Sequence, residues 1–195
     1  MVATARQLLL VAALAALPAK AALAGCPPEP WGQDNCGSFS KTSIAMDAYG
    51  NVDWRGSGGP ASRAAEFSDP SSTYKLCIWD EERLVVAADI EADAECPGGS
   101  CWTDQDGKTR RYRDEAGANG DIRAFDFTGS DATSSKLHAQ TLVIGGINLP
   151  VVGGMIAQLV RMDTGACLES FVPTDAFTID DKAAFVAKFD ANSAR

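Results

Sequence analysis

The chain has 195 residues, of which 46% are hydrophobic and 22% charged, which is enough apolar material for one domain with a sizeable core. Its formal net charge of −9 at pH 7 repels phosphate backbones and anionic lipid headgroups. The composition therefore argues against a nucleic-acid partner and against direct binding to a membrane surface.

The first 24 residues are typical of a bacterial-type secretory leader. Arg6 supplies the positive charge, an unbroken apolar run follows at 8–17, and Ala22-Leu23-Ala24 is an A-x-A cleavage signal. The run is shorter than the roughly 20 residues that a membrane span needs, so we expect no transmembrane span. Cleavage after Ala24 removes two basic residues and leaves a formal charge of −11.

The cleavage region also resembles the lipobox of bacterial lipoproteins, because Leu23-Ala24-Gly25 precedes Cys26. In that alternative the cut falls before Cys26, whose sulfur then carries diacylglycerol and anchors the protein to a membrane. Cleavage after Ala24 instead keeps all six cysteines, an even number that can pair completely. We predict export with a mature N-terminus at Gly25, and we expect membrane association only if Cys26 is lipidated.

The mature chain begins with an irregular segment and continues with short strands. Residues 25–41 are rich in Pro and Gly, and we expect them to form a disulfide-stapled loop. The best alternating pattern is at 73–80, where Tyr74, Leu76 and Ile78 share one face. Further strands are predicted at 42–48, 52–55, 84–90, 122–128, 136–144, 156–162 and 167–172, and loops or turns at 56–63, 69–72, 91–100 and 103–121.

The C-terminal segment, 178–195, carries the one helical pattern. Asp180 can cap a helix, and Phe185 and Phe189 fall on one face at i,i+4 spacing, which predicts a short helix near 179–190. The region 42–177 is predicted to be all-β, an antiparallel β-sandwich of about seven to nine strands on which the helix packs, and a β-barrel is the alternative.

Three disulfides are predicted from the positions of the six cysteines. A Pro-Gly-Gly-Ser turn brings its two flanking cysteines together, and a Pro-rich segment separates the first two cysteines of the chain. Of the remaining two cysteines, Cys77 lies in the strongest predicted strand and Cys167 begins the last predicted strand. The predicted pairs are Cys96–Cys101, Cys26–Cys36 and Cys77–Cys167.

Several short motifs after residue 51 match the landmarks of one family in order. They are Val52-Asp53-Trp54-Arg55, Glu66-Phe67-Ser68-Asp69-Pro70, Tyr74-Lys75-Leu76-Cys77-Ile78-Trp79-Asp80, Cys101-Trp102, Tyr112-Arg113-Asp114 with Asn119-Gly120-Asp121-Ile122, and Gln158-Leu159-Val160 with Gly165-Ala166-Cys167. The chain thereby resembles a family of uncharacterised secreted β-domains of soil and marine, myxobacterial-type proteobacteria. It departs from the family at Cys26 and Cys36, has Leu168 where the family has an aromatic residue, and is acidic where the family runs basic. The resemblance implies a four-cysteine β-domain and no known activity.

No constellation of residues predicts catalysis, so we expect no catalytic residue, no cofactor and no metal site. The single histidine, His138, lies on the polar side of its strand, whereas a general base needs an oriented partner. The loop 104–107, DQDG, resembles part of a calcium loop but is also good turn chemistry. Proximity of two carboxylates means little in a chain with 26 acidic residues, and a hydrolase with a carboxylate pair stays open as an alternative.

The four tryptophans allow a second alternative. An exposed Trp on a β-sandwich can stack on a sugar ring, and Trp31 and Trp54 are the candidates for such ligand stacking. Trp79 and Trp102 lie beside cysteines in the sequence, as buried core tryptophans of sandwiches do, and core packing is favoured for the set.

The sequence thus predicts an exported, non-enzymatic β-domain that is periplasmic, extracellular or at the outer-membrane surface. Its expected role is interaction or envelope structure, with an unidentified protein or glycan as partner. A carbohydrate-binding module and a hydrolase are the alternatives.

Overall fold

The computed structural model describes residues 25–192, apart from 28, 33–35, 62–63, 68, 131–132 and 144. The predicted leader at 1–24 lies outside these residues. Within them the chain forms fifteen strands and two 3-10 turns, η2 (Ala64–Phe67) and η3 (Thr174–Ala176), and no α-helix. Most strands belong to two open sheets, which confirms the β-sandwich, and neither sheet closes into the alternative barrel over the described ranges.

The larger sheet has eight strands in the order β14-β15-β2-β3-β11-β10-β9-β8, and every neighbouring pair is antiparallel. Period-2 alternation sorts its side chains: Ile44 and Trp54 are buried, whereas Ser43 and Asp53 face outward. Its strands are β2 (Lys41–Asp47), β3 (Asn51–Ala61), β8 (Trp102–Gln105), β9 (Thr109–Arg113), β10 (Ile122–Ser130), β11 (Thr133–Leu142), β14 (Phe177–Asp180) and β15 (Ala184–Asp190).

The smaller sheet has five strands in the order β1-β13-β12-β4-β5. Its pairs are antiparallel except for the parallel pair of β1 and β13. Its strands are β1 (Cys36–Ser38), β4 (Tyr74–Trp79), β5 (Leu84–Ile90), β12 (Met155–Arg161) and β13 (Cys167–Val172), and a separate hairpin joins β6 (Glu95–Cys96) to β7 (Gly99–Ser100).

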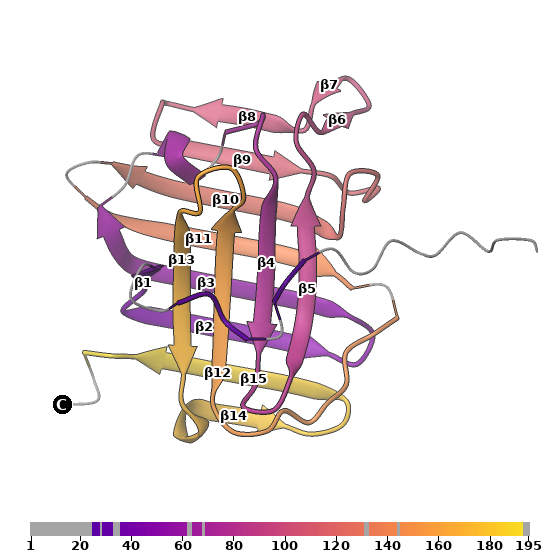
Figure 1. The fold of residues 1–195 in the computed structure, drawn as a ribbon, viewed down its shortest axis with the longest axis vertical. Helices are drawn as coiled ribbons and strands as arrows, with labels where there is room; N and C mark the ends of the chain where they lie inside the picture. Colours follow the sequence, from indigo (N-terminus) through magenta and orange to yellow (C-terminus); the bar gives the residue numbers. More distant parts are fainter. Residues whose placement is uncertain are drawn as a thin grey trace, which may run out of the picture.

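The two sheets pack face to face, and the strands of the smaller sheet run across those of the larger one (Figure 1). Large side chains fill the space between them, among them Trp54, Tyr74 and Phe125, each fully buried. One polar group in this core is satisfied across the interface, because Ser170 Oγ of β13 accepts a hydrogen bond of 3.1 Å from Trp54 Nε1. The core therefore holds both sheets in one orientation.

The predicted C-terminal helix is wrong. Residues 177–190 form the hairpin β14–β15, and β15 pairs with β2 along its whole length. Phe185 and Ala187 are fully buried and Phe189 packs against the core, so the apolar positions follow a period of two. The i,i+4 spacing of the two phenylalanines fits a strand as well as a helix, and the open edge of β2 decides between them.

Two segments predicted as loops are strands. β3 continues through Gly56 to Ala61, where Gly56 leaves room for the ring of Phe39; an added Cβ would lie 2.6 Å from that ring. The polar stretch after Cys101 forms β8 and β9, where the tilted rings of Trp102 and Tyr112 are in contact, with centroids 5.1 Å apart. These additions raise the strand number above the predicted seven to nine.

All six cysteines are disulfide-bonded, but only Cys96–Cys101 pairs as predicted. The other two bonds are Cys26–Cys77 and Cys36–Cys167. The predicted Cys77–Cys167 bond fails because β12 lies between their strands, which puts them two strand spacings, about 10 Å, apart. Instead Cys36 and Cys167 are register partners in the parallel β1–β13 pair.

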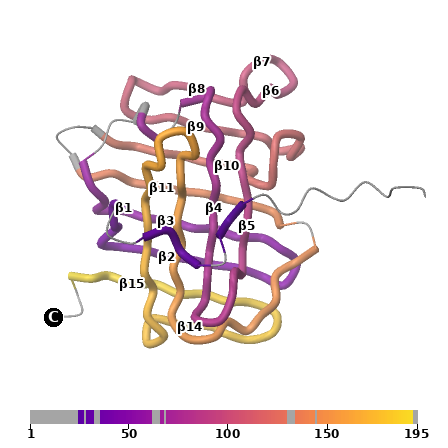
Figure 2. Tube along the Cα trace, viewed as in Figure 1, coloured from indigo at the N-terminus to yellow at the C-terminus, as the bar shows by residue number. Residues whose placement is uncertain are grey.

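The residues before β1 form a strap across the outer face of the smaller sheet (Figures 1 and 2). We call residues 25–32, as far as described, the N-terminal strap; the Cys26–Cys77 bond ties it to β4, and the Cys36–Cys167 bond ties β1, which follows it, to β13. Trp31 packs edge-on against Trp79, with ring centroids 5.9 Å apart, and Trp79 Nε1 donates to Pro27 O at 3.1 Å. The predicted self-stapled loop is thus a segment tied to the sheet.

Candidate functional site

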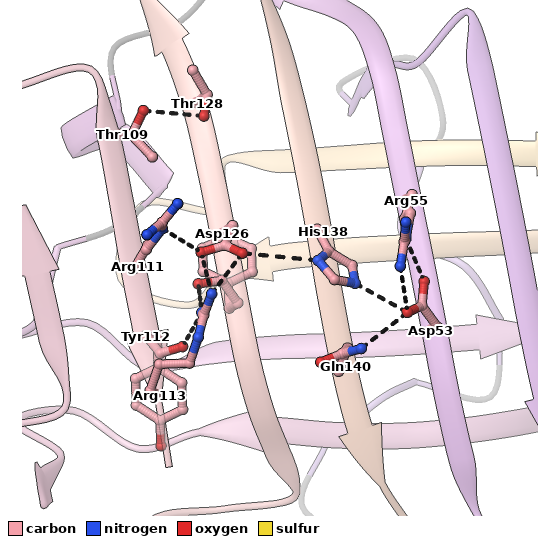
Figure 3. A network of polar contacts seen from close by, with 11 residues as sticks. Asp53, Arg55, Thr109, Arg111, Tyr112, Arg113, Asp126, Thr128, His138 and Gln140 are labelled. Atoms are coloured by element: carbon pink, nitrogen blue, oxygen red, sulfur yellow. Dashed lines mark hydrogen bonds and ion pairs between the residues drawn. The ribbon is translucent and has the colours of Figure 1, made fainter. Parts of the chain in front are cut away.

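Polar side chains line up on the outer face of the larger sheet, where four strands lie side by side. Register pairing places Arg55, His138, Asp126 and Arg111 in one row across β3, β11, β10 and β9. Their neighbours complete a continuous set of ion pairs and hydrogen bonds (Figure 3). We call this set the outer network; its members are Asp53, Arg55, Arg111, Arg113, Asp126, His138 and Gln140.

Asp53 is the acceptor at one end of the outer network. It accepts hydrogen bonds from Arg55 Nε at 2.8 Å and Gln140 Nε2 at 3.0 Å, and His138 Nε2 lies 3.1 Å from its Oδ2. Partial burial on its own raises the pKa of Asp53, but the hydrogen bonds from Arg55, Gln140 and His138 outweigh it and lower the pKa to about 2. Asp53 therefore stays ionised at any physiological pH.

Asp126 is the acceptor at the other end. Arg113 Nη2 lies 2.8 Å from both of its carboxylate oxygens, and Arg111 Nε lies 3.3 Å from Oδ1. The Nδ1 atom of His138 is 3.8 Å from Asp126 Oδ2. Both ring nitrogens of His138 thus face carboxylates, which leaves neither free to take a proton from a nucleophile.

Two adjoining hollows lie beside the outer network, over β15, β2 and β3. Their volumes are about 290 and 420 Å³, and they share Ser43, Arg55 and Lys188. We call them together the Ser43 groove. The outward side chains of Ser43 and Ala45 are small, so the sheet surface is low between Lys188 of β15 and Arg55 of β3.

A third hollow, of about 530 Å³, continues from the Ser43 groove toward the β2–β3 turn and shares Ala45 and Asp53 with it. Its polar lining includes Asn51, Glu115 and Arg123. None of the residues lining these three hollows is aromatic. The surface therefore offers hydrogen-bonding and charged groups, without a ring on which a neutral sugar could stack.

The carboxyl groups near the groove do not have the properties of an acid–base pair. A glycosidase needs one carboxyl with a raised pKa as its acid, whereas the pKa of Asp53 is lowered. Among the described carboxyls with a shifted pKa, only that of Asp121 has its pKa raised, by burial and by the nearby Asp89 carboxylate. Neither Asp121 nor Asp89 lines any of the three hollows.

The two tryptophans predicted for ligand stacking take different places. Trp54 is 0% exposed and lies in the core, so the prediction that it stacks on a ligand is wrong. Trp31 is half-buried on the strap, edge-on to Trp79. Trp102 packs in the core, as predicted, whereas Trp79 is buried outside that core, beneath the strap.

The predicted calcium-like loop is the turn of the β8–β9 hairpin. Asp104 Oδ1 accepts from the Gly107 amide and Asp106 Oδ1 from the amides of Lys108 and Thr109, so these oxygens hold the turn. Across the described ranges no group of three or more His, Cys, Asp or Glu side chains is placed to hold a metal ion.

The predicted helix cap at Asp180 is wrong, as the helix is. Asp180 ends β14, and its Oδ1 accepts a hydrogen bond from the Val151 amide. The next residue, Asp181, holds the β14–β15 turn, because its Oδ1 accepts from the amides of Ala183 and Ala184.

The sequence reasoning missed the outer network, apart from placing His138 on a polar face. A partial signal exists in the alternation itself, since Asp53, Asp126 and His138 each stand between two apolar neighbours on one strand. The order of the strands, which puts them side by side, is not written in that alternation. The order follows from non-consecutive pairing of β3 with β11.

In the portion of the chain that the structure describes, no helix is long and apolar enough to cross a membrane. Comparison with protein-family models, with curated proteins and with solved structures found no match to this chain. The resemblance to the myxobacterial-type β-domains therefore stays a prediction, and the chemistry of the outer face carries the functional argument.

Proposed function

We propose that this protein is an exported, non-enzymatic binding domain that uses the outer face of its larger sheet to hold a polar ligand. The observation that carries the proposal is the Ser43 groove beside the outer network. Small outward side chains leave room there for a ligand, while Asp53 holds Arg55 through two hydrogen bonds. A groove bordered by fixed charges binds without needing to rearrange.

Binding is favoured over catalysis because the groups beside the groove are already neutralised by their neighbours. Asp53 is paired with Arg55, Asp126 with Arg113, and His138 faces both carboxylates. A nucleophile or a general acid needs a free partner atom or a pKa near the working pH. The side chains of Asp53, Asp126 and His138 are all engaged with one another or with arginines, and the pKa of Asp53, about 2, lies far below the working pH.

Export to the periplasm, the extracellular space or the outer-membrane surface is part of the proposal. Three disulfides that use all six cysteines support it, because such bonds persist in oxidising compartments. The bond of Cys26 to Cys77 also favours the unlipidated form, since one sulfur cannot form both a disulfide and a thioether. Lipidation would leave Cys77 without its partner.

An intact-mass measurement of the exported protein tests this part. We expect the mass of residues 25–195 less six hydrogen atoms, corresponding to cleavage after Ala24 and three disulfides. A mass increased by diacylglycerol, with Cys26 at the N-terminus, would contradict it and make the protein an anchored lipoprotein.

The binding proposal is tested with the oxidised protein on arrays of glycans and of cell-envelope proteins. We expect a retained ligand that is chemically unchanged, and loss of binding in Ala45→Trp, which fills the floor of the groove from an outward position. Phe171→Ser on the opposite sheet, where the side chain is 55% exposed, is the control and should bind normally. Turnover of the ligand, or loss only in the control variant, would contradict the proposal.

A further inference from the structure

The Ser43 groove gathers positive charge in a chain of net charge −9. Lys41, Arg55 and Lys188 all line it, and they come from three adjacent strands. Lys136 stands on the same outer face, one strand farther, as the register partner of Ser57. The one carboxylate in the lining of the groove, Asp53, pairs with Arg55, so three cations face one anion there.

Strand register fixes the arrangement of these cations around Ser43. On β2, Ser43 is paired with Lys188 of β15 on one side and with Arg55 of β3 on the other. Side chains directly opposite on neighbouring strands have Cβ atoms about 5 Å apart, so the two cations flank the serine hydroxyl. Lys41 is two residues away on the same face of β2, which is about 7 Å along the strand.

Two of the three cations keep donors for a ligand. The side-chain ammonium of Lys188, on the outer face of β15, has no hydrogen-bond or ion-pair partner among the described residues. Arg55 binds Asp53 through Nε and Nη2, which leaves its Nη1 uncommitted to that carboxylate. Since Gln140 and His138 hold Asp53 from the other side, the outer network fixes the guanidinium at the edge of the groove. The third cation, Lys41, is shared with Asp190 at 2.9 Å.

We propose that the Ser43 groove binds the anionic group, carboxylate or sulfate, of an acidic oligosaccharide, with Lys188 and Arg55 as its direct ligands and Ser43 as a hydroxyl partner. This inference rests on the binding function proposed above and names its ligand class. An oxygen anion between an ammonium and a guanidinium receives charge-assisted hydrogen bonds from both. The remaining hydroxyls of a sugar chain meet polar donors and acceptors, Ser57 in the groove and Gln140 in the adjoining third hollow.

The same lining argues against other anionic ligands. Single-stranded nucleic acids are held by aromatic side chains on which bases stack, and no aromatic residue lines the groove. A peptide is recognised by apolar pockets or by an open strand edge, whereas β2 is paired on both sides and its Ser43 and Ala45 leave only a small, shallow floor. Neutral sugars lack the charge that these cations meet.

The net negative charge of the protein does not prevent this binding. At physiological ionic strength exposed charges are screened beyond about 8 Å, so a bound group is governed by the cations that surround it. The overall charge instead disfavours densely charged polyanions such as nucleic acids. An oligosaccharide with one charge per sugar is the less repelled ligand.

Isothermal titration calorimetry with the oxidised full-length mature protein tests the inference with three defined probes. They are an oligogalacturonate for the carboxylate, a kappa-carrageenan oligosaccharide, which carries sulfate and no carboxylate, for the sulfate, and a neutral maltooligosaccharide of the same length. We expect binding of at least one acidic probe, weakened by added salt, and none of the neutral probe.

Three variants assign the binding to the groove. Lys188→Gln removes one charge-assisted hydrogen bond and should weaken binding of the acidic probe about tenfold. Ser43→Glu places a like charge on the floor and should abolish binding, while its outward position leaves the core unchanged. Lys182→Gln in the exposed β14–β15 turn makes the same charge change away from the groove and should bind as the unmodified protein does. Unchanged melting temperatures establish that each variant is folded.

Binding of one acidic probe, or of both, with this variant pattern supports the inference and identifies the anionic group. Equal binding of the neutral probe, equal loss in Lys188→Gln and Lys182→Gln, or no binding of either acidic probe overturns it. If the acidic probes fail while an array ligand is still lost in Ala45→Trp, the ligand class is wrong and the proposed function stands. Insensitivity of every array ligand to Ala45→Trp would overturn the proposed function itself.

Discussion

The amide of Gln158 fixes the N-terminal strap to the smaller sheet, and its replacement gives a sharp test of how the strap is held. Gln158 is 0% exposed on the outer face of β12. Its Oε1 accepts from the Trp31 amide at 3.0 Å, and its Nε2 donates to Trp31 O at 3.0 Å and to Glu169 Oε2 at 3.1 Å. One side chain thus pairs with the Trp31 backbone as a neighbouring strand would.

The magnitude follows from these three bonds. A buried hydrogen bond contributes about 1 kcal/mol net, and one to a charged group about 2 kcal/mol, so Gln158→Leu removes about 4 kcal/mol. Burying the apolar leucine side chain recovers about 1 kcal/mol. We expect the free energy of unfolding to fall by about 3 kcal/mol and the melting temperature by about 6–12 °C.

Hydrogen exchange supplies the local measurement. The Trp31 amide donates to Gln158, so in Gln158→Leu it should exchange much faster than in the unmodified protein. The amides of β2 and β3 should exchange at the same slow rate in both proteins. Gln158→Glu should be worse at pH 7, because its carboxylate would face Glu169, and should recover as acid protonates it. Gln105→Leu, at an exposed position of β8, is the matched control with a change below about 0.5 kcal/mol. Unchanged stability and unchanged Trp31 exchange in Gln158→Leu would refute the reasoning.

Three further predictions concern other parts of the fold. Replacing Cys36 and Cys167 by Ser opens a bridge that spans 131 residues and should cost about 5 kcal/mol in denaturant melts; a loss no greater than that for the shortest bridge would contradict the loop-entropy argument. Asp53→Asn should lower stability by about 1 kcal/mol at pH 7. Because the folded pKa of about 2 lies below the ordinary 3.8, that difference should shrink between pH 4 and pH 2, and a constant difference in urea melts would count against it. Phe185→Ala, at a fully buried site of β15, should cost about 3–5 kcal/mol in the same assay, whereas a helical, loosely packed C-terminus would lose far less.

Most strands of the fold could be predicted from alternation and turn residues. The strand at 84–90 coincides with β5, and the pattern around Tyr74, Leu76 and Ile78 is the buried face of β4. Alternation does not identify the C-terminal strand, because the spacing of Phe185 and Phe189 satisfies both a helical and a strand period. Only the neighbouring strand β2 distinguishes the two.

The candidate site and two of the three disulfides depend on strand order, which no local pattern contains. Asp53 and His138 are 85 residues apart in the chain and meet because β3 pairs with β11. Cys77 and Cys167 lie in neighbouring parts of one sheet, but β12 between them sets a distance that sequence spacing cannot give. Polar residues on strands are visible in the sequence, whereas their assembly into a surface requires the topology.

The crossed pairing of the first two cysteines has a consequence for how the protein matures. A chain that emerges N-terminus first presents Cys26 and Cys36 to the oxidant long before their partners, which follow 51 and 131 residues later. An oxidant that acts while the chain emerges would first form the non-native Cys26–Cys36 link, which spans ten residues. It must be opened by attack of a later thiolate before the strap can lie across the sheet. Under such fast oxidation the chain would need a disulfide isomerase to reach the pairing seen in the structure.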